Sequence, residues 1–194
     1  MSHAAAPLPP PGSASRGPRE WNPTQLAKID VILAKYPTKK SAIMPVLWLA
    51  QDDFGWLDLD VMRLVARTLE LPPSHVHAVA SFYTMFKKVP TGRYVVDVCQ
   101  TLSCALVGAD GIVAHLERVL EVDAHGNSKD GLFTLHKVEC LASCGSGPMM
   151  QVNDHFYEFL TPESVDQILH GLRSGNPLPT PRPEANEWTW APRS

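Results

Sequence analysis

The chain has 194 residues, of which 44% are apolar and 19% charged, so it is long and apolar enough to bury a core. Its formal net charge is −3, and no segment clusters Lys and Arg with aromatic side chains, which argues against nucleic acid as a partner. No apolar run approaches the ~20 residues of a membrane helix and the first residues do not resemble a signal peptide, so we expect a cytoplasmic protein without direct membrane insertion.

The first part of the chain is predicted to be helical after a disordered start. Residues 1–20 are mostly Ala, Pro, Gly and Ser, which are too poor in large apolar groups to offset chain entropy, so we expect a disordered tail. Apolar residues then recur at helical spacing in four segments, at 23–37, 43–55, 61–71 and 74–86. Several short helices joined by short loops predict a small helical bundle over residues 21–89.

Polar residues and a glycine mark the expected ends of these helices. Ser41 is expected to cap the second helix and Gly55 to end it. Asp58 or Asp60 is expected to cap the third helix, and Ser74 the fourth. At a helix start, a side-chain oxygen accepts a hydrogen bond from a backbone N–H that the helix leaves unpaired. At a helix end, a glycine with positive φ lets the following backbone N–H groups bond the last carbonyls.

From residue 90 onward the periodicity changes, and short β-branched runs appear. The predicted order is a strand at 93–99, a helix at 105–122 despite two glycines, a strand at 132–140, a hairpin of 149–153 with 155–160, and a helix at 161–172. This order predicts a compact α/β unit of the thioredoxin-like type over residues 90–174. The whole chain is therefore expected to be of the α+β class, with the helical bundle first.

The last segment, residues 175–194, is rich in proline and is expected to form an extended tail. Trp188 and Trp190 lie near its end. They are interpreted either as a docking hook for another protein or as a strap over this chain's own surface, and the sequence leaves both open.

Four cysteines are the residues most suggestive of chemistry. In a reducing compartment they are expected to be metal ligands or catalytic thiols rather than structural disulfides. Cys99 and Cys104 form a C-x4-C pair, and Cys140 and Cys144 form a C-x3-C pair, so neither has the C-x2-C spacing of zinc knuckles and redox dithiols. Each iron of a [2Fe–2S] cluster needs two protein ligands, which two separated pairs supply. Short polar residues and backbone N–H groups in loops 100–103 and 141–143 are expected to hydrogen-bond the sulfurs.

Other interpretations of the cysteines remain at this point. Structural zinc, a redox disulfide, and four buried thiols used only as small apolar side chains are alternatives that spacing alone does not exclude. The histidines do not gather beside the cysteines in a Rieske pattern, and His75 and His77 are expected on the surface. The sequence has no glycine-rich nucleotide motif and no evident nucleophile–base pair, so we assign no catalytic residue and expect the chain to carry electrons.

Long stretches around the cysteines resemble a known family, the thioredoxin-like [2Fe–2S] subunit of bacterial NADH:quinone oxidoreductase (respiratory complex I), often called the 24 kDa subunit. The resemblance extends from about Tyr36 to Leu172. It is carried by 46-VLWLAQDDFGWL-57, 80-ASFYTMF-86, 90-PTGRYVVDVCQTLSCALVGAD-110 and 130-DGLFTLHKVECLASCGSGPMMQVND-154. It implies the two-part fold above and one [2Fe–2S] cluster on Cys99, Cys104, Cys140 and Cys144.

Two loop residues stand out in the light of this resemblance. Ala142 occupies a position where the family usually has glycine, which raises the question of the loop's backbone angles because alanine tolerates φ > 0 poorly. Pro148 fits the place at which thioredoxin-like folds commonly have a cis proline before the strand facing the redox site. A trans proline is the alternative, since most X–Pro bonds in folded proteins are trans.

The resemblance also implies partners. The chain is expected to be an enzyme subunit without a complete active site, packed against a flavoprotein that binds NADH and FMN and exchanges one electron with the cluster. Other peripheral-arm subunits of a complex on the cytoplasmic side of the inner membrane are expected neighbours. Related subunits serve NAD-linked hydrogenases and formate dehydrogenases, and the sequence does not separate these assemblies cleanly. The respiratory enzyme is favoured because no flavin or hydrogenase domain is fused to the chain.

Overall fold

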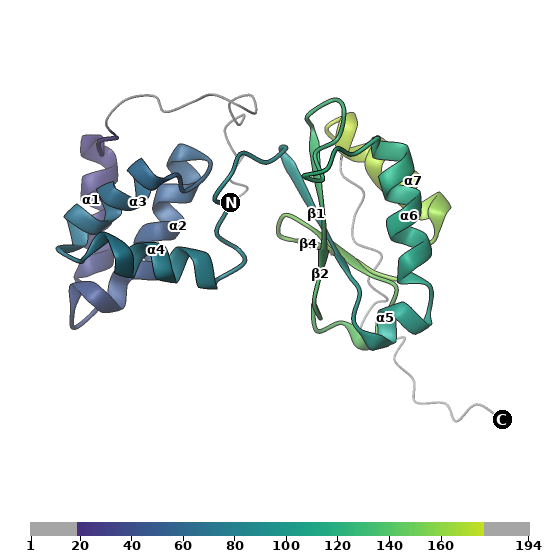
Figure 1. Ribbon diagram of the computed structural model, residues 1–194, viewed down its shortest axis with the longest axis horizontal. Coiled ribbons are helices and arrows are strands. Elements are labelled where there is room, and N and C mark those ends of the chain that lie inside the picture. Colours follow the sequence, from purple (N-terminus) through teal and green to yellow (C-terminus); the bar gives the residue numbers. More distant parts are fainter. Residues whose placement is uncertain (1–18, 177–194) are drawn as a thin grey trace. The chain divides into compact units, whose positions relative to one another are not determined.

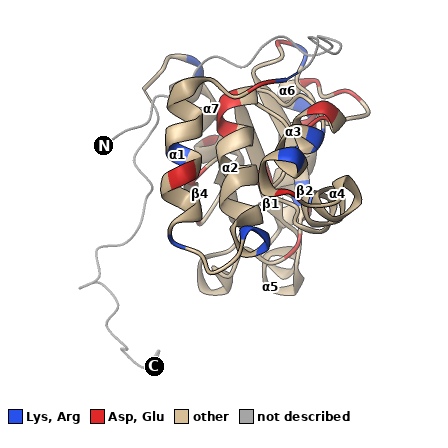
Figure 2. Ribbon diagram, turned by 90° about the vertical axis from the view of Figure 1, so that its left-hand side faces the viewer, with Lys and Arg blue, Asp and Glu red and all other residues tan. Residues whose placement is uncertain are grey.

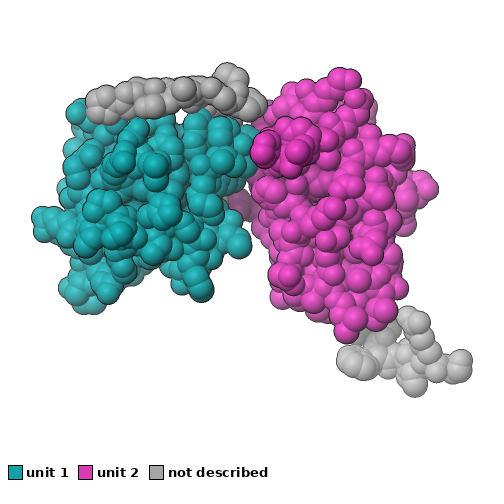
Figure 3. All heavy atoms as spheres, in the orientation of Figure 1, with its two compact units in different colours: residues 1–91 teal, residues 92–194 magenta. Residues whose placement is uncertain are grey.

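The computed structural model describes residues 19–176, and the chain divides into two compact units, residues 1–91 and 92–194 (Figures 1 and 3). Each unit has its own apolar core. Nearly all of the tails predicted at 1–20 and 175–194, including Trp188 and Trp190, lie outside the described residues. Within residues 19–176, no helix is long and apolar enough to cross a membrane.

The first unit is a bundle of short helices, as predicted. Its α-helices are α1 (Pro23–Leu33), α2 (Ile43–Phe54), α3 (Leu59–Leu69) and α4 (Pro73–Phe82), and a 3-10 helix, η1 (Lys39–Ala42), precedes α2. The apolar faces of α2, α3 and α4 meet in the core, whose fully buried members include Val46, Leu47, Leu57, Val65 and Val76. Burial of these faces supplies the stability that such short helices lack on their own.

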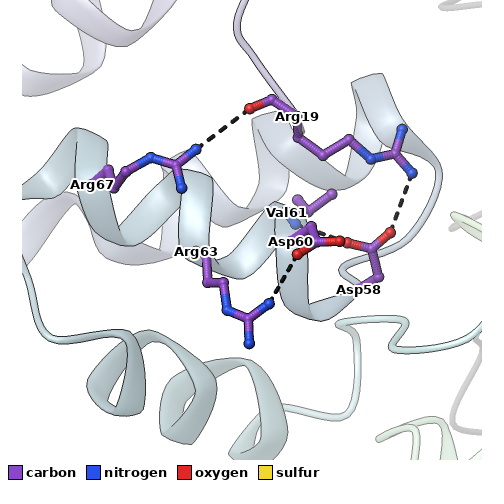
Figure 4. Close-up of polar contacts among 6 residues, drawn as sticks. All are labelled: Arg19, Asp58, Asp60, Val61, Arg63 and Arg67. Atoms are coloured by element: carbon purple, nitrogen blue, oxygen red, sulfur yellow. Dashed lines mark hydrogen bonds and ion pairs between the residues drawn. The ribbon is translucent and has the colours of Figure 1, made fainter. Parts of the chain in front are cut away.

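The start of α3 shows which of two predicted caps is used (Figure 4). Asp58 is the N-cap, because its Oδ1 accepts a hydrogen bond from the Val61 backbone N–H at 2.8 Å. Its Oδ2 accepts a second bond from Arg19 at 3.2 Å. Asp60 lies in the first turn and pairs with Arg63 at 2.9 Å. The charged residues of α3 are one acidic, Asp60, and two basic, Arg63 and Arg67, and Figure 2 shows segments of both charges on this helix.

The predicted caps at Ser41 and Ser74 are wrong. Ser41 lies inside η1, and η1 continues directly into α2, so the backbone N–H of Ile43 finds its acceptor in the carbonyl of Lys40 and no described side chain caps α2. The fourth helix begins at Pro73, before Ser74. Proline suits a first helical position because it has no N–H to satisfy.

The fourth helix also ends earlier than predicted, at Phe82 instead of residue 86. Tyr83 leaves the helix with φ −90° and ψ 118°, and its carbonyl accepts a turn hydrogen bond from Phe86 at 3.2 Å. Phe86 is 1% exposed and belongs to the core of the first unit. The turn therefore places a large apolar side chain in the core that a continued helix would have directed elsewhere.

The second unit is a four-stranded mixed sheet with helices on one face, which confirms the predicted thioredoxin-like order. The strand order is β2-β1-β3-β4, with β1 parallel to β2 and antiparallel to β3. The strands are β1 (Tyr94–Cys99), β2 (Phe133–Val138), β3 (Met150–Val152) and β4 (His155–Tyr157). The helices are α5 (Leu102–Leu106), α6 (Ala109–Leu120), α7 (Pro162–Arg173) and the 3-10 helix η2 (Cys144–Ser146). Figure 1 shows α6 and α7 against the same side of the sheet.

The single helix predicted at 105–122 is two helices. Gly108, with φ 101°, separates α5 from α6 and serves as the N-cap of α6. A left-handed residue stops an α-helix, and glycine adopts that conformation at little cost. The break lets α5 carry Cys104 while α6 follows its own direction and buries Ile112 and Leu116 against the sheet.

Alternation along β1 explains both the core and the position of the site. Val96 and Val98 point into the core with α6 and α7, whereas Asp97, between them, pairs with His136 of β2 at 3.0 Å. Cys99 is the last residue of β1 and lies beside Val138, the last residue of β2. Because the two strands are parallel, the loops that follow them leave the sheet at the same edge.

Candidate metal centre

The structure brings all four predicted cysteines to this edge of the sheet. Cys99 ends β1 and Cys104 lies on α5, which follows it directly. Cys140 comes just after β2, and Cys144 opens η2. The chain is fixed here by backbone hydrogen bonds, among them one from Cys99 N–H to the Met149 carbonyl at 3.2 Å. The two pairs therefore approach the same region from two loops.

Each pair is a preformed two-thiol set. The Sγ atoms of Cys140 and Cys144 are 3.5 Å apart. Two thiolates bound to one tetrahedral metal at ~2.3 Å lie about 3.8 Å apart, so this pair fits a shared metal with little movement. Cys99 and Cys104 also hydrogen-bond each other. The pairs differ in surroundings: Cys99 and Cys104 are 2% and 1% exposed, whereas Cys140 and Cys144 face solvent.

Hydrogen-bond donors surround the sulfurs, as predicted for the loops at 100–103 and 141–143. The backbone N–H of Ala142 donates to Cys140 Sγ at 3.3 Å. Backbone groups of Leu141 and Thr101 donate to Cys99, and the Ser103 hydroxyl bonds Cys144. Such donors favour the thiolate and, in iron–sulfur proteins, tune the reduction potential.

The thiols perturb one another's pKa. Burial raises the pKa of Cys104 to about 11, helped by the hydrogen bond and charge of Cys99. Cys144 has a raised pKa mainly because of its hydrogen bond with Cys140 and the charge of that neighbour. Burial also opposes ionisation of Cys99, but its hydrogen bonds outweigh burial and the net pKa is lowered. Positive charge beside Cys104 and Cys144 would favour their thiolates, and a metal centre provides such charge.

The geometry is that of two pairs rather than of a closed single-ion cage. Among residues 19–176, no group of three or more His, Cys, Asp or Glu side chains is placed to bind one metal ion. Two separated two-thiol sets suit a centre with two metal atoms better than a single tetrahedral ion. The residues present therefore fit a [2Fe–2S] cluster.

The loop beyond Cys144 depends on special backbone conformations. A Cβ atom at Gly147 would lie 3.2 Å from Cys104 Sγ and 3.1 Å from Val107 Cγ2, so glycine permits the close approach of the two loops. The Gly147–Pro148 peptide bond is cis, so the trans alternative is wrong. Ala142 has φ 64°, which is a left-handed conformation. The loop therefore keeps a backbone angle that favours glycine, although alanine occupies the position.

One polar cluster beside the thiols was not predicted. Glu158, which follows β4, is 8% exposed and accepts hydrogen bonds from Ser143, the residue before η2, and from Ser146, the last residue of η2. Nothing in the local sequence around Glu158 indicates this contact, because it depends on the pairing of β4 with β3. It connects the second cysteine loop to the far edge of the sheet.

Known proteins resemble the chain in both sequence and fold. The family model "Thioredoxin-like [2Fe-2S] ferredoxin" matches residues 29–173. Among the E subunits of NADH-quinone oxidoreductase, that of Mycobacterium tuberculosis is 38% identical over 178 residues, which cover 87% of this chain and 71% of that protein. NADH-quinone oxidoreductase subunit 2 of Thermus thermophilus is 40% identical over 153 residues, which cover 77% of this chain and 84% of that protein.

A solved structure shares the fold at lower identity. The air-oxidised NAD+-reducing [NiFe]-hydrogenase aligns with a TM-score of 0.60 and 19% identity, covering 75% of this chain but only 24% of that hydrogenase chain. At this identity the likeness concerns the fold alone. Together with the family match and the curated relatives, the two thiol pairs at one sheet edge show that the chain belongs to the thioredoxin-like [2Fe–2S] ferredoxin family, among whose members are the E subunits of NADH-quinone oxidoreductase.

Proposed function

We propose that this chain is the electron-transfer subunit of the NADH-oxidising part of an NADH-quinone oxidoreductase, with one [2Fe–2S] cluster held by Cys99, Cys104, Cys140 and Cys144. The observation that carries the proposal is the convergence of two thiol pairs at one sheet edge in a member of this family. When bound, the cluster accepts and returns one electron at a time. The chain's own residues hold it and set its surroundings.

The two pairs divide this work. Cys99 and Cys104 are buried and anchor the cluster to β1 and α5. Cys140 and Cys144 are exposed, so the cluster edge that they hold is the edge open to a partner. The Ser103 hydroxyl and the Ala142 N–H stabilise negative charge on the sulfurs of this outer pair.

The partner is a flavoprotein subunit that binds NADH and FMN, so neither molecule is bound by this chain. An exposed apolar patch beside Cys104 supports this proposal: Leu102 is 70% exposed, Leu106 77% and Val107 54%. Exposed apolar side chains gathered on a short helix and the residue after it are typical of a surface that another protein covers. The assembly is proposed to lie on the cytoplasmic side of the inner membrane, with further peripheral-arm subunits around it.

A hydrogenase or formate dehydrogenase assembly is the alternative, and the fold shared with the hydrogenase favours it over unrelated functions. The surrounding assembly would differ, but the electron transfer from a reduced flavoprotein would be the same. The discriminating observation is the identity of the subunits that copurify with the chain from its natural source.

The test of the electron-transfer role uses the chain coexpressed with its cognate flavoprotein. Addition of NADH should bleach the visible absorption of the cluster. Leu106→Asp should slow the bleaching about 10-fold by weakening docking, with iron content unchanged, because a charge in an apolar interface costs one to several kcal/mol. The matched control is Leu59→Asp on the first unit. Leu59 is exposed as Leu106 is, at 56%. Absence of bleaching in the wild-type pair, or equal slowing in both variants, would contradict the proposal.

A further inference from the structure

The carboxylate of Glu158 and the hydroxyls of Ser143 and Ser146 form a compact cluster within and beside the second cysteine loop. Ser146 donates a hydrogen bond to Glu158 Oε1 at 2.5 Å, and Ser143 donates to the same oxygen. The two hydroxyl oxygens are 2.7 Å apart. Ser146 and Glu158 are 5% and 8% exposed, so these contacts are largely shielded from water. Ser143 directly precedes Cys144 in the chain, and Ser146 follows it by two residues. The hydrogen bonds of the cluster therefore constrain the backbone that carries a proposed ligand.

Backbone hydrogen bonds join the same two segments. The N–H of Phe159 donates to the Ser146 carbonyl at 2.8 Å, and the N–H of Leu160 donates to the Pro148 carbonyl at 2.9 Å. Side-chain and backbone hydrogen bonds thus connect residues 158–160 to residues 143–148. Within the loop, the Ser146 N–H donates to the Ser143 carbonyl at 3.2 Å, which closes the turn of η2.

The cysteine loop needs such an anchor. It lies beyond the end of β2, both of its thiols are exposed, and η2 is only three residues long. A short 3-10 turn is weakly held by its own hydrogen bonds. Hydrogen bonds from hydroxyls to a carboxylate are stronger than neutral ones, and inside a shielded site they are disrupted less by water. Glu158, from the opposite edge of the sheet, therefore adds hydrogen bonds to a loop that has few of its own.

We propose that Glu158 is a positioning residue of the metal centre: by accepting hydrogen bonds from Ser143 and Ser146, it fixes Cys144 at the distance from Cys140 that a shared iron requires. The proposal rests on the proposed function, because it assumes that these thiols bind the cluster. Its effect on the thiols passes through the two serines that it binds and the backbone between them.

The experiment compares Glu158→Ala with Glu158→Gln in the full-length, cluster-loaded protein. Loss of the carboxylate in Glu158→Ala should speed loss of visible absorption to a chelator about 10-fold, in the range found for groups that orient metal ligands. It should also change the electron paramagnetic resonance g values of the reduced protein. Glu158→Gln should restore most of the lifetime and of the wild-type g values, because its amide oxygen accepts the same two bonds, although more weakly than a carboxylate does. Asp154→Ala, an exposed carboxylate at the turn between β3 and β4, is the control and should match wild type.

Two results would overturn the proposal: a wild-type lifetime and wild-type g values in Glu158→Ala, or a Glu158→Gln protein as labile as Glu158→Ala. Should Glu158→Ala fail to fold, the Ser143→Ala/Ser146→Ala double variant, which retains the carboxylate, should show the same faster loss, and a wild-type lifetime there would refute the role. A wild-type protein without iron would instead defeat the proposed function, so the two failures are distinguishable.

Discussion

Ala142 offers a direct test of the geometry between the two exposed ligands. Its φ of 64° lies in the left-handed region, where a β-carbon costs roughly 1–2 kcal/mol. Replacing it with glycine removes this cost but makes the unfolded chain more flexible, which takes back roughly 0.4–1 kcal/mol. The expected net result is a stabilisation of about 0.5–1 kcal/mol. The hydrogen bond to Cys140 Sγ comes from the backbone and is retained.

The assay is thermal unfolding of the cluster-free protein, in which Ala142→Gly should raise the transition by about 2–3 °C. The matched control is Ala114→Gly, which makes the same chemical change at an exposed position inside α6. There glycine should destabilise by about 1 kcal/mol, since the backbone is helical. If Ala142→Gly lowers the transition as Ala114→Gly does, the left-handed conformation at Ala142 is wrong.

Three further predictions concern separate parts of the molecule. Asp58→Ala removes the cap of α3 and should cost ~1 kcal/mol in urea unfolding, whereas Asp60→Ala loses one exposed ion pair and should cost under ~0.5 kcal/mol; equal losses would contradict the cap. Burial opposes ionisation of Asp130, but its hydrogen bonds outweigh burial, so the pKa of Asp130 is lowered from its ordinary value of 3.8. The charge of Asp130 therefore stabilises the fold above the unfolded pKa, and this stabilisation is lost as the pH falls through the folded pKa. The stability deficit of Asp130→Asn measured at pH 7 should therefore shrink in acid, and a constant deficit would refute the assignment. Cys140→Ser should lower iron content far more than Ser103→Ala, which should shift the reduction potential instead, and equal iron loss would contradict the ligand role.

The order of elements could be predicted because it depends on local periodicity. The strand at 93–99 and the capped helix at 161–172 appear within one or two residues of their predicted bounds, since a β-branched run and a helix cap are both recognisable in a short window. Two other helix bounds were not predicted. The early end of α4 follows from the burial of Phe86 in the core, which depends on residues distant in the sequence, whereas the division of the helix at 105–122 follows from the left-handed conformation of Gly108, a glycine that was expected to be tolerated inside the helix.

The cysteines of the site could be predicted from the sequence, but the polar cluster around Glu158 could not. The cysteine spacing indicated two thiol pairs, and the structure places both pairs at one edge of the sheet because β1 and β2 are parallel and end together. Glu158 could not be foreseen, because it reaches Ser143 and Ser146 only through the pairing of β3 with β4. Local sequence therefore identified the proposed ligands, whereas the residue that fixes one of them emerges only from the tertiary structure.

Chemical analysis of the purified protein tests the central claim most directly. The account predicts about two irons and two acid-labile sulfides per chain, with visible absorption that bleaches on reduction with dithionite and disappears in variants of the four cysteines. A colourless protein with one tightly bound zinc per chain, unchanged by reductant, would contradict the electron-transfer assignment.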